Sequence, residues 1–424
     1  MPPLAVSIWK EQGSAIVGNN YTTFDSVGNS VALSADAKTL VVGAPGLWGN
    51  SDREGHVEVY RYDEDGGNWT QLGQTIYGNA TGDSFGWSVD ISADGSTILL
   101  GSPQYSAYFD RPGYARVYSL TIDDEAGAST WWKQIGLDIV GEAIGDQFGL
   151  SVSISGDGKT LAVGADTHDA NLLENSGHVR IYRLENDGVS WEKVGEDIVG
   201  EVTGDLLGHS VSLSANGSIV ATGAILGASN PYNGVRTGQV KVFRIDSAGS
   251  SWEQLGPSIY GDNVDDVFGW SVDISPDGYT LAIGSPGWFT NTDRPGYVRV
   301  FSLEEDDEVG TVRWKRIGED IPGDVNGDLC GWSVSLSNNA RTLAVGAPYN
   351  DVNGGNSGLV RVYRIIDSKS GWMKLGKDID GEADGDESGA SVCLSGDGNT
   401  VAIGSKFSDD KLRDSGKVRV FAME

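Results

Sequence analysis

The sequence predicts an all-β protein, a seven-bladed β-propeller of four-stranded antiparallel blades, and three observations carry this prediction. One phrase recurs seven times, no stretch of ten or more residues has helical periodicity, and the two ends of the chain supply complementary parts of one repeat. Each copy is marked by a Ser-Val pair, which begins at Ser30, Ser88, Ser151, Ser210, Ser271, Ser333 and Ser391.

Each repeat contains four strand signals in a fixed order. The first is a period-two alternation, as in Ser151–Ser155, and the second is a continuous apolar run, as in Thr160–Ala165, typical of a strand covered on both faces. A Gly- and Asp-rich turn joins them, which suits a tight hairpin. The third signal is typified by Gly177–Tyr182, and the fourth begins at a Trp, as in Trp191–Ile198.

Seven such units cannot bury both faces alone, so we expect them to stack radially into one closed domain over residues 1–424. An extra fourth-strand phrase, Ile8–Ile16, precedes the first repeat, and the last repeat stops after Lys417–Phe421. Residues 1–17 are therefore expected to form the outer strand of blade 7 and to close the ring. The expected blades are 25–77, 83–140, 146–199, 205–260, 266–322, 328–380 and 386–424.

Repeats 2–4 resemble repeats 5–7, which indicates duplication of a three-blade block. Trp87–Ser92 matches Trp270–Ser275, and Asp110–Tyr114 matches Asp293–Tyr297.

The composition limits the classes of partner. Sixty acidic against 30 basic side chains give a formal net charge of −30, which repels phosphate backbones and disfavours nucleic acid. No apolar run of about 18 residues is present, so no membrane insertion is expected. No signal peptide is visible, while four Asn-x-Ser/Thr sequons favour an extracellular, cell-surface or lumenal location.

The phrase Phe-Gly-x-Ser-Val followed by Leu-Ala-Val-Gly-Ala-Pro resembles the FG-GAP repeat, the unit of the integrin α-subunit propeller. It is written here as Phe148-Gly149 with Gly164-Ala165, and as Phe268-Gly269 with Gly284-Pro286. The resemblance implies the same propeller fold, closed in the same way. Integrin-type repeats often bind calcium in the hairpin between the first two strands. The hairpins here, such as Gly156-Asp157-Gly158, offer a single carboxylate, so that calcium site is not carried over.

A recurring acid precedes each first strand, and the copies are Asp83, Asp146, Asp205, Asp266, Asp328 and Asp386, with Asp25 as a seventh. These acids should form a ring on one face of the propeller. They could bind calcium or a basic ligand. Alternatively, each could accept backbone N–H groups of the following Phe-Gly turn, and repetition in every blade favours this structural role.

The loops between the second and third strands open on the same face and differ most between blades. They carry the predicted ligand-binding aromatic residues Trp48, Tyr105, Tyr108, Phe109, Tyr232, Trp288, Phe289 and Tyr349. Such side chains could bind a protein or glycan partner, or they could pack onto neighbouring loops. Arg53, Arg111 and Arg294 share one loop position, where an Asp–Arg pair fixing the turn is expected.

Trp87, Trp270 and Trp332 share the position just before the first strand, where other copies have Leu150, His209 or Ala390. Blade packing is the expected role of this position.

No catalytic residues are predicted, because the four His residues are scattered and no nucleophile or phosphate-binding motif is present. The sequence therefore favours a non-catalytic binding or adhesion module that presents loop faces to a protein or glycan. The alternatives are a structural subunit of a larger assembly and a propeller-type polysaccharide hydrolase or lyase.

Overall fold

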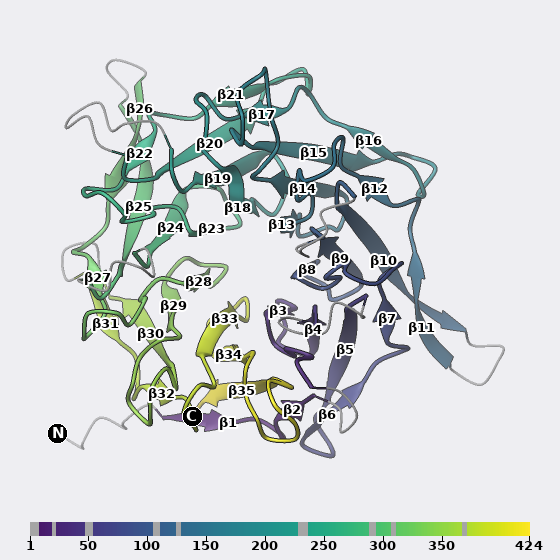
Figure 1. Cartoon of the computed structure of the whole chain (residues 1–424), viewed down its shortest axis with the longest axis vertical. Coiled ribbons are helices and arrows are strands. Elements are labelled where there is room, and N and C mark those ends of the chain that lie inside the picture. The colour runs from purple at the N-terminus through teal and green to yellow at the C-terminus, as the bar shows by residue number, and fades with distance from the viewer. Residues whose placement is uncertain are drawn as a thin grey trace.

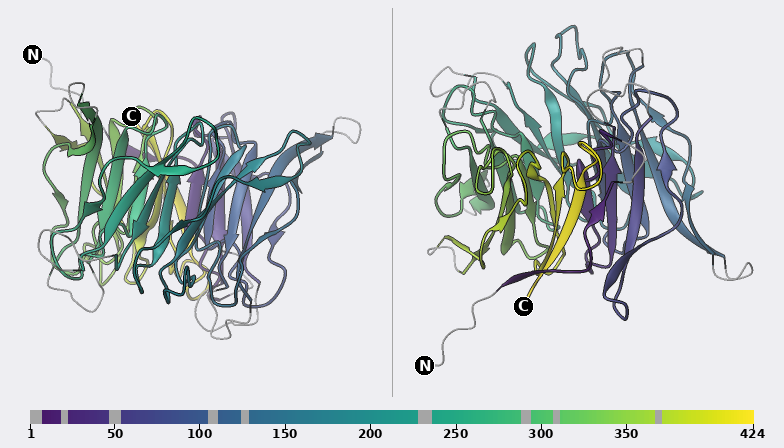
Figure 2. Two further views of the ribbon diagram at one scale, coloured as in Figure 1. Left: turned by 90° about the horizontal axis from the view of Figure 1, so that it is seen from above. Right: turned by 60° about the horizontal axis from the view of Figure 1, so that its bottom comes forward.

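The computed structural model describes residues 8–18, 23–46, 54–104, 111–123, 129–227, 236–287, 294–306, 311–366 and 371–424. Within these ranges there is no helix, and the strands form seven sheets arranged around a central axis (Figure 1). The predicted fold class, a seven-bladed propeller, is confirmed. Seen from the side, the blades form a disc with loops on both faces (Figure 2).

Each blade has its four strands in antiparallel order from the axis to the rim. The innermost strands are β3 (Ser30–Leu33), β8 (Ser88–Ile91), β13 (Ser151–Ile154), β18 (Leu207–Leu213), β23 (Ser271–Ile274), β28 (Ser333–Leu336) and β33 (Ser388–Leu394). The second strands are β4 (Thr39–Ala44), β9 (Thr97–Ser102), β14 (Thr160–Ala165), β19 (Ile219–Ala224), β24 (Thr280–Ser285), β29 (Thr342–Ala347) and β34 (Thr400–Ser405). The third strands are β5 (His56–Asp63), β10 (Tyr114–Asp123), β15 (His178–Leu184), β20 (Gln239–Ile245), β25 (Tyr297–Asp306), β30 (Leu359–Ile365) and β35 (Lys417–Met423).

The outer strand differs from the expectation because it is broken into two pieces, both of which pair with the third strand. The Trp pieces are β1 (Trp9–Glu11), β6 (Asn68–Gln71), β11 (Ser129–Gln134), β16 (Trp191–Lys193), β21 (Trp252–Gln254), β26 (Thr311–Arg316) and β31 (Trp372–Lys374). The short second pieces are β2 (Ile16–Val17), β7 (Ile76–Tyr77), β12 (Ile139–Val140), β17 (Ile198–Val199), β22 (Ile259–Tyr260), β27 (Ile321–Pro322) and β32 (Ile379–Asp380). A glycine at positive φ, such as Gly195 at 71°, lies in the break and bends the chain.

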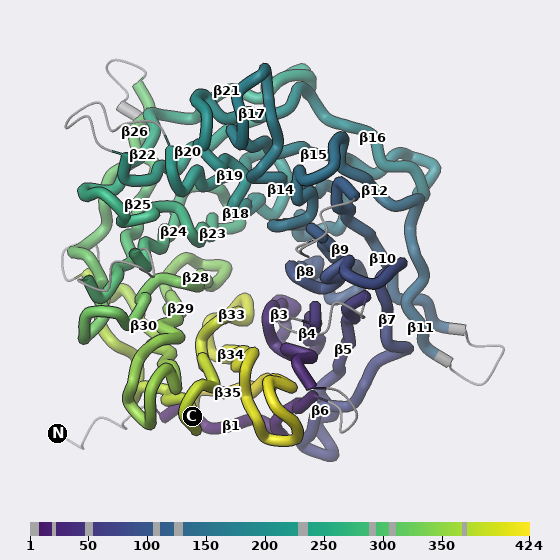
Figure 3. Tube along the Cα trace, viewed as in Figure 1, coloured from purple at the N-terminus to yellow at the C-terminus, as the bar shows by residue number. Residues whose placement is uncertain are grey.

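The ring closes as predicted, with β1 and β2 pairing to β35. Trp9 lies opposite Met423 and Ile16 opposite Val418, so the N-terminal strand is the rim of blade 7. The purple start and the yellow end of the trace lie side by side there (Figure 3).

The Ser of the repeated Ser-Val pair forms a hydrogen bond between neighbouring blades. In all seven blades the hydroxyl of the Ser-Val pair donates to a glycine carbonyl of the next blade at 2.7 to 2.9 Å, and the last of these bonds joins Ser391 to Gly28. The glycine of the second strand is needed at the same contact, because a Cβ on Gly164 would lie 2.1 Å from the Gly208 oxygen.

The rim Trp residues make a second set of contacts between blades. Six indole N–H groups donate to a carbonyl of the preceding blade, as Trp314 does to Leu255 at 2.9 Å and Trp9 to Leu375 at 2.9 Å. Within the described residues, the indole nitrogen of Trp372 has no such partner. Buried apolar clusters fill the space between adjacent blades, as where Leu99 and Val117 pack with Phe148 and Val163.

A third set of hydrogen bonds between blades lies nearest the axis. It is made by the residue two positions after the Ser of the Ser-Val pair in the innermost strands. In blades 3, 4 and 6 a Ser hydroxyl accepts the next blade's backbone N–H, as Ser335 does from Leu394 at 3.0 Å. In blades 2 and 5 the same position holds Asp90 and Asp273, which accept the corresponding N–H groups at 2.7 and 2.6 Å.

Candidate functional site

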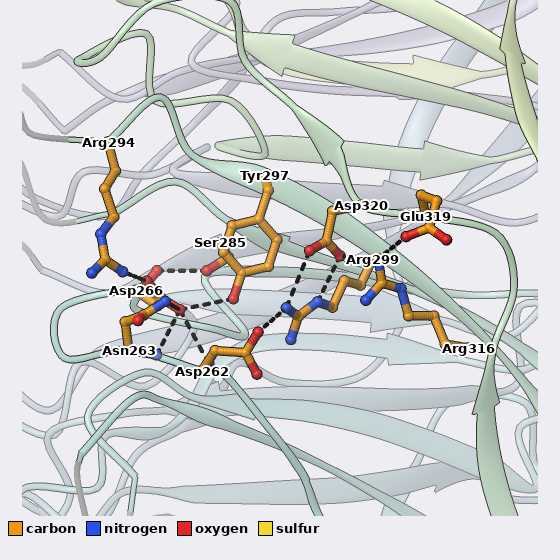
Figure 4. Close-up of polar contacts among 10 residues, drawn as sticks. All are labelled: Asp262, Asn263, Asp266, Ser285, Arg294, Tyr297, Arg299, Arg316, Glu319 and Asp320. Carbon is orange, nitrogen blue, oxygen red and sulfur yellow. Dashed lines mark hydrogen bonds and ion pairs between the residues drawn. The ribbon is translucent and has the colours of Figure 1, made fainter.

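The recurring acids are buried, and their main role is to organise the loop in front of each innermost strand. In blade 5, Asp266 is 2 % exposed, and its Oδ2 accepts the backbone N–H of Asn263 at 3.0 Å and the hydroxyl of Tyr297 at 2.9 Å (Figure 4). Its Oδ1 pairs with Arg294 at 2.6 Å. The expected Asp–Arg pair is confirmed here and in blade 2, where Arg111 pairs with Asp83.

The sequence predicted a structural role for the recurring acids but named the wrong hydrogen-bond donors. The carboxylates accept N–H groups three or four residues upstream, as Asp205 does from Val202 and Glu201, and not those of the following Phe-Gly turn. The residue after each acid has positive φ in all seven blades and is never glycine, as with Leu206 at 56° and Glu387 at 52°. Such residues are strained, so the carboxylate stabilises a turn that is costly to form.

These carboxylates do not fit a calcium site. Calcium takes six to eight oxygen ligands, whereas each of these acids has an oxygen committed to backbone N–H groups. In the part of the chain that the structure describes, no group of three or more His, Cys, Asp or Glu side chains could hold a metal ion.

The second set of acids, one turn upstream, is neutralised by basic residues of the third strands. Arg299 pairs with Asp262 and, at 2.7 Å, with Asp320. Arg180 similarly joins Glu142 and Asp197, each at 2.6 Å. The net charge of this face is therefore lower than its acid content indicates.

Most of the predicted ligand-binding aromatic residues fall outside the described ranges. These are Trp48, Tyr105, Tyr108, Phe109, Tyr232, Trp288 and Phe289. Tyr349 is described, and its ring lies parallel to that of Trp332, with centroids 6.5 Å apart.

The position before the innermost strand was expected to pack between blades, and in blades 4 to 6 its side chains contact one another from blade to blade in a row. The ring centroids of His209 and Trp270 are 4.5 Å apart, and those of Trp270 and Trp332 are 4.6 Å apart. The ammonium of Lys406 lies 5.2 Å from the Trp332 ring centre. We call His209, Trp270, Trp332 and Lys406 the axial arc. It crosses blades 4 to 7, and its three ring side chains are half-buried.

One end of the axial arc carries a His–carboxylate pair. His209 Nδ1 lies 2.9 Å from Asp166 Oδ2, and Asp166 follows directly on β14 of the neighbouring blade. His209 lies in the bulge that shifts the register between Leu207 and Ser210, and bulges of this kind re-aim side chains. A carboxylate on one ring nitrogen fixes the orientation of the imidazole and leaves Nε2 to exchange a proton.

The other end of the axial arc carries an acid and a cation in contact. Lys406 Nζ lies 3.2 Å from Glu387 Oε2, and both side chains are largely buried. Burial raises the pKa of Glu387, while Lys406 opposes this shift. Burial and the adjacent Glu387 also raise the pKa of Tyr349, so its hydroxyl stays protonated at neutral pH.

Sequence reasoning missed the axial arc as a site. The shared position of His209 with Trp270 and Trp332 was the available signal, but the arc depends on contacts between successive blades. Asp166 gave no signal, because its partner lies in another repeat.

The geometry defines a class, a closed propeller of seven repeats whose loop face differs from blade to blade. The particular repeat is also identified, because the family model for the FG-GAP repeat matches residues 141–182 and 322–363, in blades 3 and 6. The chain thus carries FG-GAP repeats. No curated protein matches the sequence.

Several solved propellers are similar in fold. Two are candidate 6-phosphogluconolactonases, from Bacteroides uniformis (TM-score 0.56, 16% identity, 88% of each chain covered) and Bacteroides fragilis (TM-score 0.52, 16% identity, 84% of this chain and 85% of that one). A third is the periplasmic gluconolactonase of Pseudomonas aeruginosa (TM-score 0.52, 18% identity, 84% of this chain and 86% of that one).

These structures correct the functional prediction from sequence. The non-catalytic binding or adhesion module, and with it the prediction that the chain is not an enzyme, is contradicted, because the similar propellers are described as lactonases. They favour the enzyme alternative. At 16 to 18% identity the likeness itself shows the fold alone, so the choice of reaction depends on the residues of this chain. The described residues contain no helix long and apolar enough to cross a membrane.

Proposed function

We propose that this chain is a hydrolase of a sugar-derived substrate, with its active site at the axial arc. The observation that carries the proposal is the His209–Asp166 pair at 2.9 Å, beside the half-buried ring of Trp270. An oriented imidazole next to an aromatic wall is suited to general-base chemistry on a substrate that has an apolar face.

A cyclic ester is the substrate class that His209, Asp166 and Trp270 suit best, in line with the lactonases of similar fold. His209 would take a proton from water while the water oxygen bonds to the ester carbonyl carbon. The ring C–O bond would then break, and the leaving oxygen would take the proton from His209. Asp166 would hold the ring and stabilise its charged form during the reaction.

The other end of the axial arc would bind the substrate. Lys406 supplies a positive charge beside Trp332 for a carbonyl or carboxylate oxygen. Glycoside hydrolysis, the chemistry of the polysaccharide alternative, usually needs a facing pair of carboxyl groups. Asp166 is engaged with His209 and Glu387 with Lys406, so that pair is less well supported.

The test is proton release from aldonolactones, run beside a panel of polysaccharides. General-base catalysis contributes roughly 100- to 10,000-fold, so His209→Asn should lower kcat/KM by at least about 100-fold. Asp166→Asn should reduce kcat with little change in KM, because it removes only the group that orients the base. His56→Asn is the matched control, since His56 also lies near a carboxylate, Asp25 at 3.9 Å, but belongs to blade 1. Turnover that His209→Asn leaves unchanged, or no turnover on either panel, would refute the proposal.

A further inference from the structure

Blade 6 carries two neighbouring arginines on the face opposite the recurring acids. Arg341 directly precedes β29, and Arg364 lies near the end of β30, where it pairs with Thr342 across the sheet. Both positions lie at the far end of the blade from Trp332, which directly precedes β28. The two arginines are therefore separate from the axial arc.

Both arginines line a cavity of about 410 Å³, which we call the blade 6 crevice. It lies between the first hairpins of blades 6 and 7, which are joined where the N–H of Asn338 donates to the Gly396 carbonyl at 2.9 Å. The crevice wall includes Arg341, Arg364, Ile366, Asp397 and Asn399.

Within the described residues, neither guanidinium of the blade 6 crevice forms an ion pair with an acid. Arg364 donates to two neutral acceptors, the Thr342 hydroxyl at 3.4 Å and Asn399 Oδ1 at 3.1 Å. The Arg341 guanidinium has no hydrogen-bond partner in the same part of the chain. Because the chain has 60 acidic and only 30 basic side chains, two adjacent cations without an acid are unexpected. Their N–H groups are available to an external acceptor.

Asp397, the acid in the crevice wall, is engaged by its own hairpin. Its Oδ1 accepts the Ser395 hydroxyl at 2.6 Å and the Asn399 backbone N–H at 2.9 Å. Its Oδ2 accepts the side-chain amide of Asn399 at 3.0 Å. The Ser–Asp bond of this turn recurs in blade 3, between Ser155 and Asp157, so Asp397 has a structural role. One carboxylate also leaves the charge of the two guanidinium groups in excess.

Blade 6 lacks an acid that most other blades have beside this position. The position follows the residue that pairs with the rim Trp, as Ile366 follows Ile365, the partner of Trp372. In five other blades it is acidic, and the residues are Asp63, Glu185, Asp246, Glu304 and Glu424. Such an acid neutralises a nearby base, as Glu304 does Lys315 at 2.8 Å. In blade 6 the equivalent Ile366 is 62 % exposed and carries no charge.

We propose that the blade 6 crevice binds an acidic peptide segment of a partner protein, with a carboxylate between Arg341 and Arg364. Guanidinium groups suit a carboxylate because their planar fork matches its two oxygens. The exposed Ile366 favours a peptide over a free carboxylic acid, because it offers an apolar contact to the residue next to the acid. The inference does not depend on the hydrolase proposal, because it uses no residue of the axial arc.

The test is calorimetric titration of the full chain with the peptide acetyl-Ala-Glu-Leu-Glu-Ala-amide. A salt concentration of about 0.15 M screens the long-range repulsion from the net charge of −30. The matched peptide acetyl-Ala-Gln-Leu-Gln-Ala-amide has no carboxylate. We expect saturable one-site binding of the first peptide and at least about tenfold weaker binding of the second.

Two variants test the residues of the crevice. Ile366→Glu restores the acid of the other blades, so it should weaken binding of the acidic peptide at least about tenfold. Arg341→Gln combined with Arg364→Gln should have the same effect. The control is Arg183→Gln in blade 3, because Arg183 pairs with Thr160 as Arg364 does with Thr342 but has Glu185 at the position of Ile366. It should leave binding unchanged, and thermal unfolding checks that each variant is folded.

The proposal fails if the two peptides bind equally, or if either crevice variant binds as well as the wild type. It also fails if Arg183→Gln weakens binding as much as the double arginine variant does, since general charge would then explain the effect. Sodium acetate that competes at the concentration of the peptide would overturn the peptide assignment. Inorganic phosphate that competes better than the peptide would overturn the carboxylate assignment. The hydrolase assay on Ile366→Glu separates the two proposals, because turnover should be retained while peptide binding is lost.

Discussion

Blades 3 and 6 have the same second-strand sequence and different loop faces. β14 and β29 share the sequence Thr-Leu-Ala-Val-Gly-Ala, and Ser151 and Ser333 donate to Gly208 and Gly389 at 2.7 and 2.8 Å. At the face, however, the acid of blade 3 lies 3.0 Å from His168, whereas that of blade 6 lines a cavity. The contacts between blades are therefore the same in these two repeats, while the surroundings of the recurring acid differ.

The largest effect should come from the shared scaffold and should be equal in the two blades. Gly164→Ala and Gly346→Ala place a Cβ 2.1 and 2.2 Å from a glycine carbonyl of the next blade. Because that neighbour is backbone, we expect each change to lower the free energy of unfolding by about 3–5 kcal/mol. Urea denaturation measures it. A loss in one blade only would show that the two scaffolds are not equivalent.

A smaller difference should separate two rim Trp residues. Trp314→Phe removes the hydrogen bond to Leu255, whereas Trp372→Phe removes an indole N–H that has no partner within the described residues. The two changes lose the same volume, so the first should cost about 1 kcal/mol more. Equal losses in thermal unfolding would mean that packing alone sets the contribution of this ring.

At the position nearest the axis, blades 2 and 5 have Asp, whereas blades 3, 4 and 6 have Ser. Burial raises the pKa of Asp90 to about 6 and that of Asp273 to about 7. The folded state therefore binds more protons than the unfolded state between about pH 4 and 7, and stability falls as pH rises through this window. Asp90→Ser with Asp273→Ser should flatten that fall and raise the melting temperature at pH 8 relative to the wild type. Ser335→Ala removes a hydroxyl that bonds to Leu394 of the next blade, so it is the control and should leave the pH dependence unchanged.

Adding or removing calcium should change the stability of the protein less than any of the substitutions above. The sequence left calcium binding by the recurring acids open, and their geometry does not fit it. A ligand that binds only the folded state raises the melting temperature. Because we expect no such calcium site, the melting temperature should differ by less than about 2 °C between excess calcium and exhaustive chelation. A larger shift with stoichiometric bound metal would restore the calcium hypothesis.

The fold was predictable because its determinants repeat. The Ser of the Ser-Val pair and the Gly of the second strand contact the next blade, and the rim Trp contacts the preceding blade, so a period in the sequence becomes a ring of equivalent contacts. The break in the outer strand at Gly195 was not predicted, since a single glycine within a strand signal does not state its φ.

The site was not predictable in the same way, because it depends on departures from the repeat. His209 occurs once at its position, Asp166 belongs to another blade, and Ile366 replaces an acid that most other blades have. The extracellular or lumenal location and the protein or glycan partner stay predictions.

The pairing of β1 with β35 sets an order of events during synthesis. The ribosome makes β1 and β2 of blade 7 before it makes their partner, β35. The backbone edge that carries Trp9 and Ile16 therefore stays unpaired while the six blades between them are synthesised. At elongation rates of about 5–20 residues per second this interval is on the order of 20–80 s. A cell that produces this chain must keep that early strand from pairing with another nascent copy, so slow translation or crowded polysomes should favour dimers joined through blade 7.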